Sequence, residues 1–348
     1  MTIKRLVLPA VCMVLALAVL LTACPASAPT TPPEDMPQDV DLIVMGFRAG
    51  TSQQLRADTI AEAIRVEYPN WQVTSLAAGG EARVMNKRIE GEADYFFSMY
   101  PRHLEVEVHA PLHPEIDFEA ATAYSAVMPV TNRPIHFLAL PKTGLNSIGD
   151  IVEKKYPFKA GTGAGVAKLL FEKILGYYGS SLGEAEAWGA RHETVVMVMP
   201  EGVEALRAGT VDIGLSWGPI PYPVFMGVTF DLKLLPIDDP GLIQFFKSLG
   251  YDEVVIPAGT YPFVTQDVPS VTDYEFLATR PDMPDDIVYY TLKALFSHQD
   301  MLIAASANFE EQLAPAAIAN SLKVMEQSGV PIHPGALEFY REMGWVDW

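Results

Sequence analysis

Three short motifs carry residue types that could do chemistry, and the first points to a nucleophilic serine. The segment 214–218, GLSWG, matches the G-x-S-x-G pattern of serine hydrolases. That chemistry needs Ser216 on a sharp turn between a strand and a helix, with its hydroxyl beside a histidine. Pro219, Pro221 and Pro223 follow the motif, and proline cannot continue a helix interior. We therefore keep a serine hydrolase only as a third interpretation.

The second motif is a glycine-rich joint, GTGAGVAKLL, at residues 161–170. No Lys-Ser/Thr pair follows and the spacing differs from G-x-G-x-x-G, so it is not a nucleotide-binding loop. Glycines that open a helix expose backbone N–H groups and the positive end of the helix dipole to an anion. We expect Gly163, Ala164, Gly165 and Val166 to contact a ligand; a turn selected only for close packing is the alternative.

The third motif is the polar joint within VMGFRAGTSQQLRADTIAEAI, residues 44–64, where a buried strand is followed by a helix. Arg48 offers a planar guanidinium for a carboxylate, and Thr51, Ser52 and Gln53 offer hydrogen bonds at the start of the helix. We expect Ser52 near the helix cap. The nearby Arg56 and Arg83 are reserve candidates for the same role and are interpreted first as surface charges.

A cluster of possible metal ligands lies in HLEVEVHAPLH, which contains His103, Glu105, Glu107, His109 and His113. The alternation is typical of an exposed strand edge, and ligand spacing alone is weak evidence. We predict no metal and no cofactor.

Aromatic residues follow the predicted strand ends, where an open α/β sheet places its ligand crevice. Trp217 and Tyr100 are expected beside a ligand, with Tyr222 as a further aromatic candidate and core packing as the alternative for all three.

These motifs belong to a chain in which strands and helices alternate, which predicts an α/β fold of parallel βαβ units. We expect strands at 42–46, 71–76, 93–99, 158–161, 194–199 and 211–217, and helices at 55–67, 81–90, 166–178 and 201–208.

The alternation occurs twice, and matched residues indicate a repeated half. Three pairs of residues share one offset along the chain, namely Gly91 with Gly209, Asp94 with Asp212 and Ser98 with Ser216. Each glycine can adopt the left-handed conformation that ends a helix. Chance similarity is the alternative at this length.

Two apolar segments, RPIHFLALPKTG and SVTDYEFLATR, connect the halves and predict a two-strand hinge. The expected lobes are 41–138 with 270–348, and 139–269.

The first residues predict export. Two cations and an apolar run precede Leu-Thr-Ala-Cys24, so 1–23 is expected to be a signal peptide and Cys24 a lipid anchor in the manner of bacterial lipoproteins, with a plain signal peptide as the alternative. Residues 24–40, rich in proline, read as a tether. The formal net charge of −19 repels phosphate backbones, so no nucleic-acid partner is expected.

The chain resembles the TAXI family of solute-binding proteins that serve TRAP (tripartite ATP-independent periplasmic) transporters. The likeness is carried by IPAGTYPFVTQDVPSV, IHPGALEFYREMG, AGGEARVMNKRIEGEAD, GTGAGV and LPIDDP. It implies a type II Venus-flytrap fold, capture of a small organic acid or amino acid without catalysis, and delivery to a TRAP permease.

The resemblance also implies cleft residues by position. The family's usual small-residue loop is replaced here by RAGTSQQLR, and its T-G-G-S by Ala78-Gly79-Gly80-Glu81. The positions expected to face the ligand are Arg48, Thr51, Ser52, Gln53, Gly79, Gly80, Glu81, Ser98, Tyr100, Gly163, Ala164, Gly165, Val166, Trp217 and Pro219. We therefore predict a lipid-anchored extracytoplasmic binding protein for a small anionic or zwitterionic solute; a sensor lipoprotein without a permease is the second interpretation.

Overall fold

The first half of the fold is a parallel βαβαβ unit. The computed structural model describes residues 36–100, 112–163, 165–307 and 309–348. Strands β1 (Asp41–Gly46), β2 (Gln72–Ala77) and β3 (Tyr95–Met99) alternate with helices α1 (Ser52–Glu67) and α2 (Glu81–Ile89). Strand β1 lies between β2 and β3 and is parallel to both. The alternation of elements is as predicted, and α1 begins three residues earlier than expected because Thr51 caps it.

The second half repeats this order with shorter strands. Strands β5 (Lys159–Gly161), β6 (Arg191–Glu193) and β7 (Ile213–Trp217) alternate with α7 (Val166–Tyr177) and α9 (Pro200–Ala208), and β5 lies parallel between β6 and β7. The predicted strand at 194–199 is wrong. The strand is 191–193, and the apolar residues that follow it form a loop.

The matched residues of the two halves occupy equivalent places. Gly91 and Gly209 both have left-handed backbones, with φ of 72° and 69°. The Asp94 carboxylate accepts a hydrogen bond from the N–H of Ile43 in β1 at 2.8 Å. Likewise, the Asp212 carboxylate accepts one from the N–H of Lys159 in β5 at 2.8 Å. The sequence match therefore reflects the same connection between a helix and a parallel strand.

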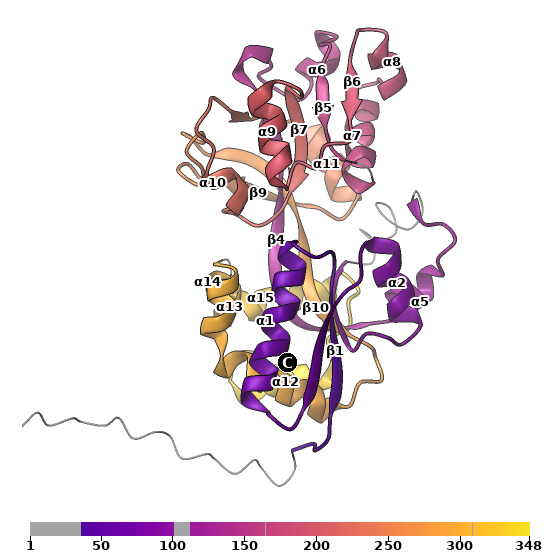
Figure 1. Ribbon diagram of the computed structural model, residues 1–348, viewed down its shortest axis with the longest axis vertical. Coiled ribbons are helices and arrows are strands. Elements are labelled where there is room, and N and C mark those ends of the chain that lie inside the picture. The colour runs from indigo at the N-terminus through magenta and orange to yellow at the C-terminus, as the bar shows by residue number, and fades with distance from the viewer. Residues whose placement is uncertain (1–35, 101–111, 164, 308) are drawn as a thin grey trace, which may run out of the picture. The chain divides into compact units, whose positions relative to one another are not determined.

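Two long antiparallel strands, β4 (Ser125–Ala139) and β10 (Val268–Thr279), join the halves. Figure 1 shows them running from one half into the other. The sheet order is β2-β1-β3-β10-β4-β7-β5-β6, and β8 (Lys233–Leu234) and β9 (Asp252–Ile256) pair with β4 and β10. The fold is a two-lobed α/β fold joined by two crossing strands, as predicted. The exact lobe bounds stay a prediction.

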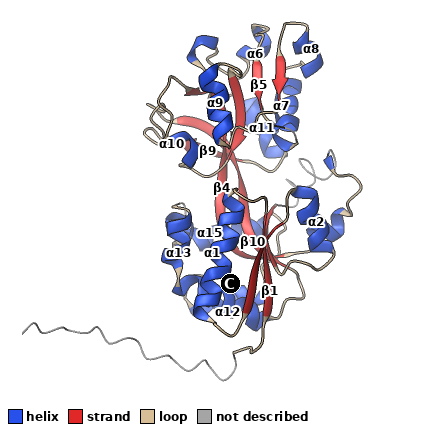
Figure 2. Cartoon of the chain, viewed as in Figure 1, coloured by secondary structure: helices blue, strands red, loops and turns tan. Residues whose placement is uncertain are grey.

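Helices surround the strands of each half (Figure 2). Helix α1 packs against α12 (Asp285–Ser297) and α13 (Gln299–Ala305), which follow β10 in the chain. The remaining elements are α5 (Phe118–Thr122), a 3-10 turn (Pro141–Thr143), α6 (Asp150–Glu153), α8 (Leu182–Glu186), α10 (Pro223–Met226), α11 (Pro240–Ser248), α14 (Phe309–Gln312), α15 (Pro315–Gln327) and α16 (Pro334–Glu342).

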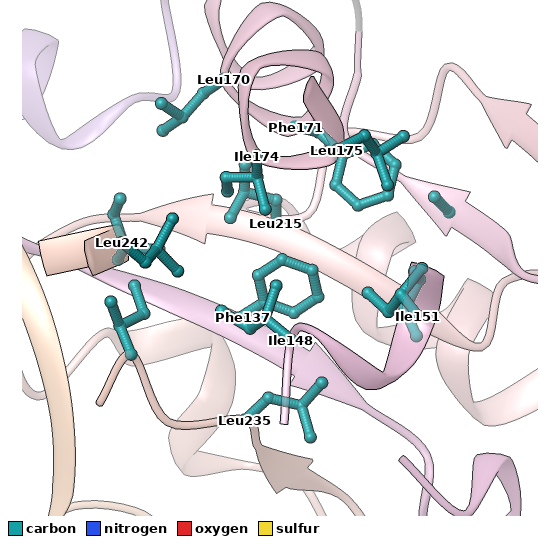
Figure 3. Close-up of a cluster of buried hydrophobic side chains, with 14 of the residues drawn as sticks. Phe137, Ile148, Ile151, Leu170, Phe171, Ile174, Leu175, Leu215, Leu235 and Leu242 are labelled. Atoms are coloured by element: carbon teal, nitrogen blue, oxygen red, sulfur yellow. The ribbon is translucent and has the colours of Figure 1, made fainter. Parts of the chain in front are cut away.

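The core of the second half forms around β4 and β7. Figure 3 shows Phe137 of β4 and Leu215 of β7 beneath Leu170, Phe171 and Ile174 of α7. These side chains are almost fully buried, so removal of apolar surface from water stabilises this half. Within the parts of the chain that the structure describes, no helix is both long and apolar enough to cross a bilayer.

Candidate functional site

A cavity of about 320 Å³ lies beside β4 and β10, the two crossing strands. The strand-to-helix joints before α1 in the first half and before α7 in the second half also line it. This volume suits a small molecule. Its lining comprises residues 45–48, 50–53, 84, 85, 88 and 97–99 of the first half, 133 and 275 of the crossing strands, and 162, 163, 166, 167, 196–199, 215–219 and 222 of the second half.

Most of the predicted ligand-binding residues line this cavity. They are Arg48, Thr51, Ser52, Gln53, Ser98, Gly163, Val166, Trp217 and Pro219. Segments about a hundred residues apart in the chain are thus brought together at one place, because both halves direct their strand-to-helix joints toward it. Contact of these residues with a ligand stays a prediction.

The other predicted residues that the structure describes do not line the cavity. Tyr100 is buried and stacks on Tyr274 of β10, with ring centres 5.5 Å apart. Gly79 accepts a hydrogen bond from Arg48 Nε at 3.0 Å, and Gly80 and Gly165 are the residues before α2 and α7. Glu81 begins α2. Ala164 and Cys24 lie outside the described residues.

Thr51 caps the joint before α1, and Ser52 lies next to the cap, as predicted. Thr51 is the N-cap: its hydroxyl accepts a hydrogen bond from Gln54 N at 3.3 Å and donates one to Arg48 O at 2.7 Å. Ser52 is the first helical residue, and its hydroxyl reaches Gln53 Oε1 at 3.5 Å. The cap therefore fixes the backbone beside the cavity.

Sequence reasoning missed a group of charges where α1 meets the crossing strands. This crossing-strand charge cluster consists of four charged side chains, Arg56, Arg133, Asp273 and Glu275, together with the amide of Gln53. Arg56 Nη1 lies 2.6 Å from Glu275 Oε2, and the two side chains are only 1% and 4% exposed. The interpretation of Arg56 as a surface charge is therefore wrong: the helix turns it toward the buried carboxylate of β10.

Each arginine of the cluster lies beside a carboxylate. Arg133 Nε donates to Asp273 Oδ1 at 2.9 Å, and Gln53 Nε2 donates to Glu275 Oε1 at 3.2 Å. Burial opposes the positive charge of Arg133, but Asp273 and Glu275 raise its pKa above the ordinary value. For Arg56 burial prevails and lowers the pKa despite Glu275. A charged residue inside an apolar strand, as in SVTDYEFLATR, was the sequence signal for this cluster.

A third missed arginine, Arg88 of α2, lines the cavity without a carboxylate partner among the described residues. Its Nη1 donates to Ser98 Oγ at 3.2 Å and its Nη2 to the Ala121 carbonyl. Its Nε is buried and has no hydrogen-bond partner among the residues that the structure describes. The guanidinium carbon lies 4.7 Å from the centre of the Phe96 ring. Burial lowers the pKa of Arg88 to about 10, so it is still charged at neutral pH.

Ser216 of the GLSWG motif lies in the cavity wall, but not in the geometry of a hydrolase. Its hydroxyl is buried and has no hydrogen-bond partner in the described structure. His136 is paired with it across β4 and β7, yet both ring nitrogens are engaged, Nδ1 with Pro134 O at 2.9 Å and Nε2 with Tyr261 Oη at 2.7 Å. No described histidine contacts the hydroxyl to activate it.

The metal-ligand motif cannot be located as a group, because residues 101–111 lie outside the described chain. His113 is described, and its Nδ1 is 3.6 Å from Glu115 Oε1. The described residues contain no group of three or more side chains that could hold a metal ion.

Comparison with known proteins gives one family match and more distant likenesses. A crystal structure of a glycine betaine/carnitine/choline ABC transporter is similar over 89% of this chain and all of that one, at 12% identity and a TM-score of 0.41. A structure titled as a periplasmic transporter is similar over 88% and 93%, at 14% identity and a TM-score of 0.45. The ligand-binding domain of AvGluR1 with glutamate is similar over 79% and 97%, at 12% identity and a TM-score of 0.42.

A curated relative matches a smaller part of the chain. It is 1-deoxy-D-xylulose 5-phosphate reductoisomerase of Phocaeicola vulgatus, 34% identical over 95 residues, or 26% of this chain. This chain spans about a quarter of that protein (24%). The family model, in contrast, matches residues 111–344, which include the second half, both crossing strands and the helices after β10. The chain belongs to the NMT1-like family.

Proposed function

We propose that this protein is an extracytoplasmic solute-binding protein that captures a small organic acid or amino acid in the cavity and delivers it to a TRAP-type membrane permease. One observation carries the proposal: the cavity takes its walls from both halves, while β4 and β10 are the only described strands that run from one half into the other. A solute held there contacts two bodies that a small bend of two strands could separate.

Binding would follow from closure of the two halves. A solute that touches both walls only in the closed state binds that state more tightly, and the difference in affinity shifts the population toward it. The polar joints at Thr51 and Gly163 supply hydrogen-bond donors from opposite walls, and Trp217 supplies an apolar surface.

The location of the protein follows in this proposal from its first forty residues. Residues 1–23 direct export, Cys24 carries the lipid that anchors the chain to a membrane, and 24–40 tether the folded part. The periplasm or the cell surface is the expected place of binding, beside the permease. Delivery to a TRAP permease rests on the TAXI-like motifs.

The first test is native mass spectrometry of freshly purified protein. A bound molecule of small mass, released on denaturation, is expected; protein that never carries or binds a small solute would contradict the proposal. Uptake of the labelled solute is then compared in cells with and without the protein. Loss of uptake supports delivery, whereas binding without any effect on uptake would favour a sensor.

A further inference from the structure

The charges of the cavity wall do not balance. Arg48, Arg88 and Arg133 line it, but Glu275 is the one acidic residue among the described lining residues. Arg133 is paired with Asp273 and Glu275 with Arg56. Among the described residues, two positive charges, Arg48 and Arg88, therefore remain without a carboxylate, in a chain whose formal net charge is −19.

The two remaining arginines differ in their surroundings. Arg48 is exposed, and its Nε already donates to Gly79 O. Arg88 is partly buried, its Nε has no hydrogen-bond partner among the described residues, and aromatic rings lie beside its guanidinium. A buried charge without an opposite charge is costly. No described carboxylate meets the charge of Arg88, so an anion in the cavity would be its first ionic partner.

The described part of the wall offers no free carboxylate to a positively charged group of a ligand. The Glu275 carboxylate accepts hydrogen bonds from Gln53 at Oε1 and from Arg56 at Oε2. An α-ammonium group placed there would compete with a buried guanidinium for the same oxygens. In the described lining, a cationic or zwitterionic ligand finds no unoccupied carboxylate.

Much of the remaining wall is apolar. Met45, Met85 and Phe97 line it from the first half, and Val196, Met199 and Trp217 from the second. Methionine adapts its shape to irregular apolar ligands, and such walls favour an apolar body.

We propose that Arg88, together with the Ser98 hydroxyl it contacts, binds the carboxylate of a small organic acid that has an apolar body and no ammonium group. This inference rests on the proposed function and narrows its ligand class from organic acids and amino acids to apolar monocarboxylates. Arg88 is then the residue that sets selectivity for the acid, while Arg48 stays at the exposed edge of the cavity.

The ligand class is tested with matched probes that share a carbon skeleton. Calorimetric affinities are measured for 4-methylpentanoate, 4-methylpentanamide and leucine, and for 3-phenylpropanoate, 3-phenylpropanamide and phenylalanine. At least one acid is expected to bind about tenfold or more tightly than its amide and its amino acid. An amino acid that binds more tightly than the matched acid would overturn the ligand class.

The role of Arg88 is tested with R88Q, and the matched control is R83Q. Arg83 lies on the same helix α2, but it is exposed and does not line the cavity. R88Q is expected to lower the affinity for the acid by about 10- to 100-fold and to abolish the preference for acid over amide. R83Q is expected to keep both the affinity for the acid and the preference for acid over amide. Equal weakening of acid and amide in R88Q would mean that Arg88 only supports the fold.

Two further variants test the same assignment if R88Q does not fold. Arg88→Lys keeps the charge but not the planar fork, and Ser98→Ala removes the neighbouring hydroxyl. Each is expected to reduce the acid-to-amide ratio partly; a ratio unchanged in both would overturn the assignment.

The failures of the two proposals can be told apart. If no acid binds but native mass spectrometry finds a neutral or cationic ligand, this inference is wrong and the binding function stands. If no probe binds and the purified protein carries no small molecule, the binding function itself fails.

Discussion

At the scale of single residues, the crossing strands carry charges where their neighbours are apolar. Arg133, Asp273 and Glu275 are almost fully buried, and each is paired. Desolvation makes such charges costly, and pairing offsets this cost only while all partners are present. The strongest effects of single substitutions on stability are therefore expected here.

Glu275→Gln is the sharpest test of this cluster. The change removes the charge opposite Arg56 and leaves a buried guanidinium uncompensated. The free energy of unfolding, measured with urea, is expected to fall by about 3 to 5 kcal/mol. The matched control is Glu253→Gln, which breaks the exposed pair with Lys247 and should cost less than about 1 kcal/mol. Equal effects of the two variants would contradict the role given to the cluster.

His136 gives the stability a dependence on pH. Burial lowers the pKa of His136 from 6.5 to about 4, so the folded state holds the ring neutral. The unfolded chain binds the proton below about pH 6.5, and stability therefore falls as the pH decreases toward 4. This residue alone should make the free energy of unfolding about 2 kcal/mol lower at pH 5 than at pH 7.

Urea unfolding of His136→Gln at pH 7 and pH 5 checks this contribution. The variant should lose less stability between the two values than the unchanged protein does. Tyr261→Phe removes the hydroxyl that contacts the ring but keeps the imidazole, and should retain the fall. If His136→Gln lost as much stability between pH 7 and pH 5 as the unchanged protein, the loss would be caused by other titratable groups.

At the scale of elements, local patterns predict the helices and most of the strands. Apolar runs between amphipathic stretches mark β1, β2 and β3, and the glycine at the end of each second helix is found as expected. The run 194–199 was predicted to be a strand, but its residues 196–199 line the cavity and Val195 packs against a core cluster. Burial against a cavity and burial in a strand produce the same apolar sequence.

Two glycines with open space around them separate backbone strain from packing. A Cβ at Gly91 or at Gly176 would meet no atom within 4 Å. Gly91 has a φ of 72°, so Gly91→Ala should destabilise the fold by about 1 to 2 kcal/mol. Gly176 lies inside α7, and Gly176→Ala should stabilise by about 0.5 to 1 kcal/mol. Thermal unfolding shifts of the same sign would contradict this account.

At the scale of the whole molecule, the site combines segments that no local pattern connects. Arg48 and Trp217 were predicted because each follows or ends a predicted strand, and Ser98 was predicted from the resemblance to the TAXI family. All three line the cavity. Arg88 looks like any other polar residue of an amphipathic helix, and its burial depends on Phe96 and Tyr124, which pack over it from β3 and from the residue before β4. Glu275 reaches the cavity only because β10 returns between the halves. These contacts depend on tertiary packing and not on spacing.

The continuous strand β4 couples the stability of the two halves. Val127 and Met128 are buried in the first half, whereas Ile135 and Phe137 belong to the core of the second. Scanning calorimetry of the folded part is expected to give one unfolding transition, with calorimetric and van't Hoff enthalpies in agreement. Two resolved transitions would show that the halves unfold independently.

The shared strand also bears on resistance to proteolysis. Proteases attack the transiently opened state, in proportion to its population when opening is fast. If neither half can open without disrupting β4, a partly opened intermediate with one half exposed to cleavage becomes rare. A ligand that binds in the cavity would then protect the whole folded part from digestion, including helices far from any contact with it.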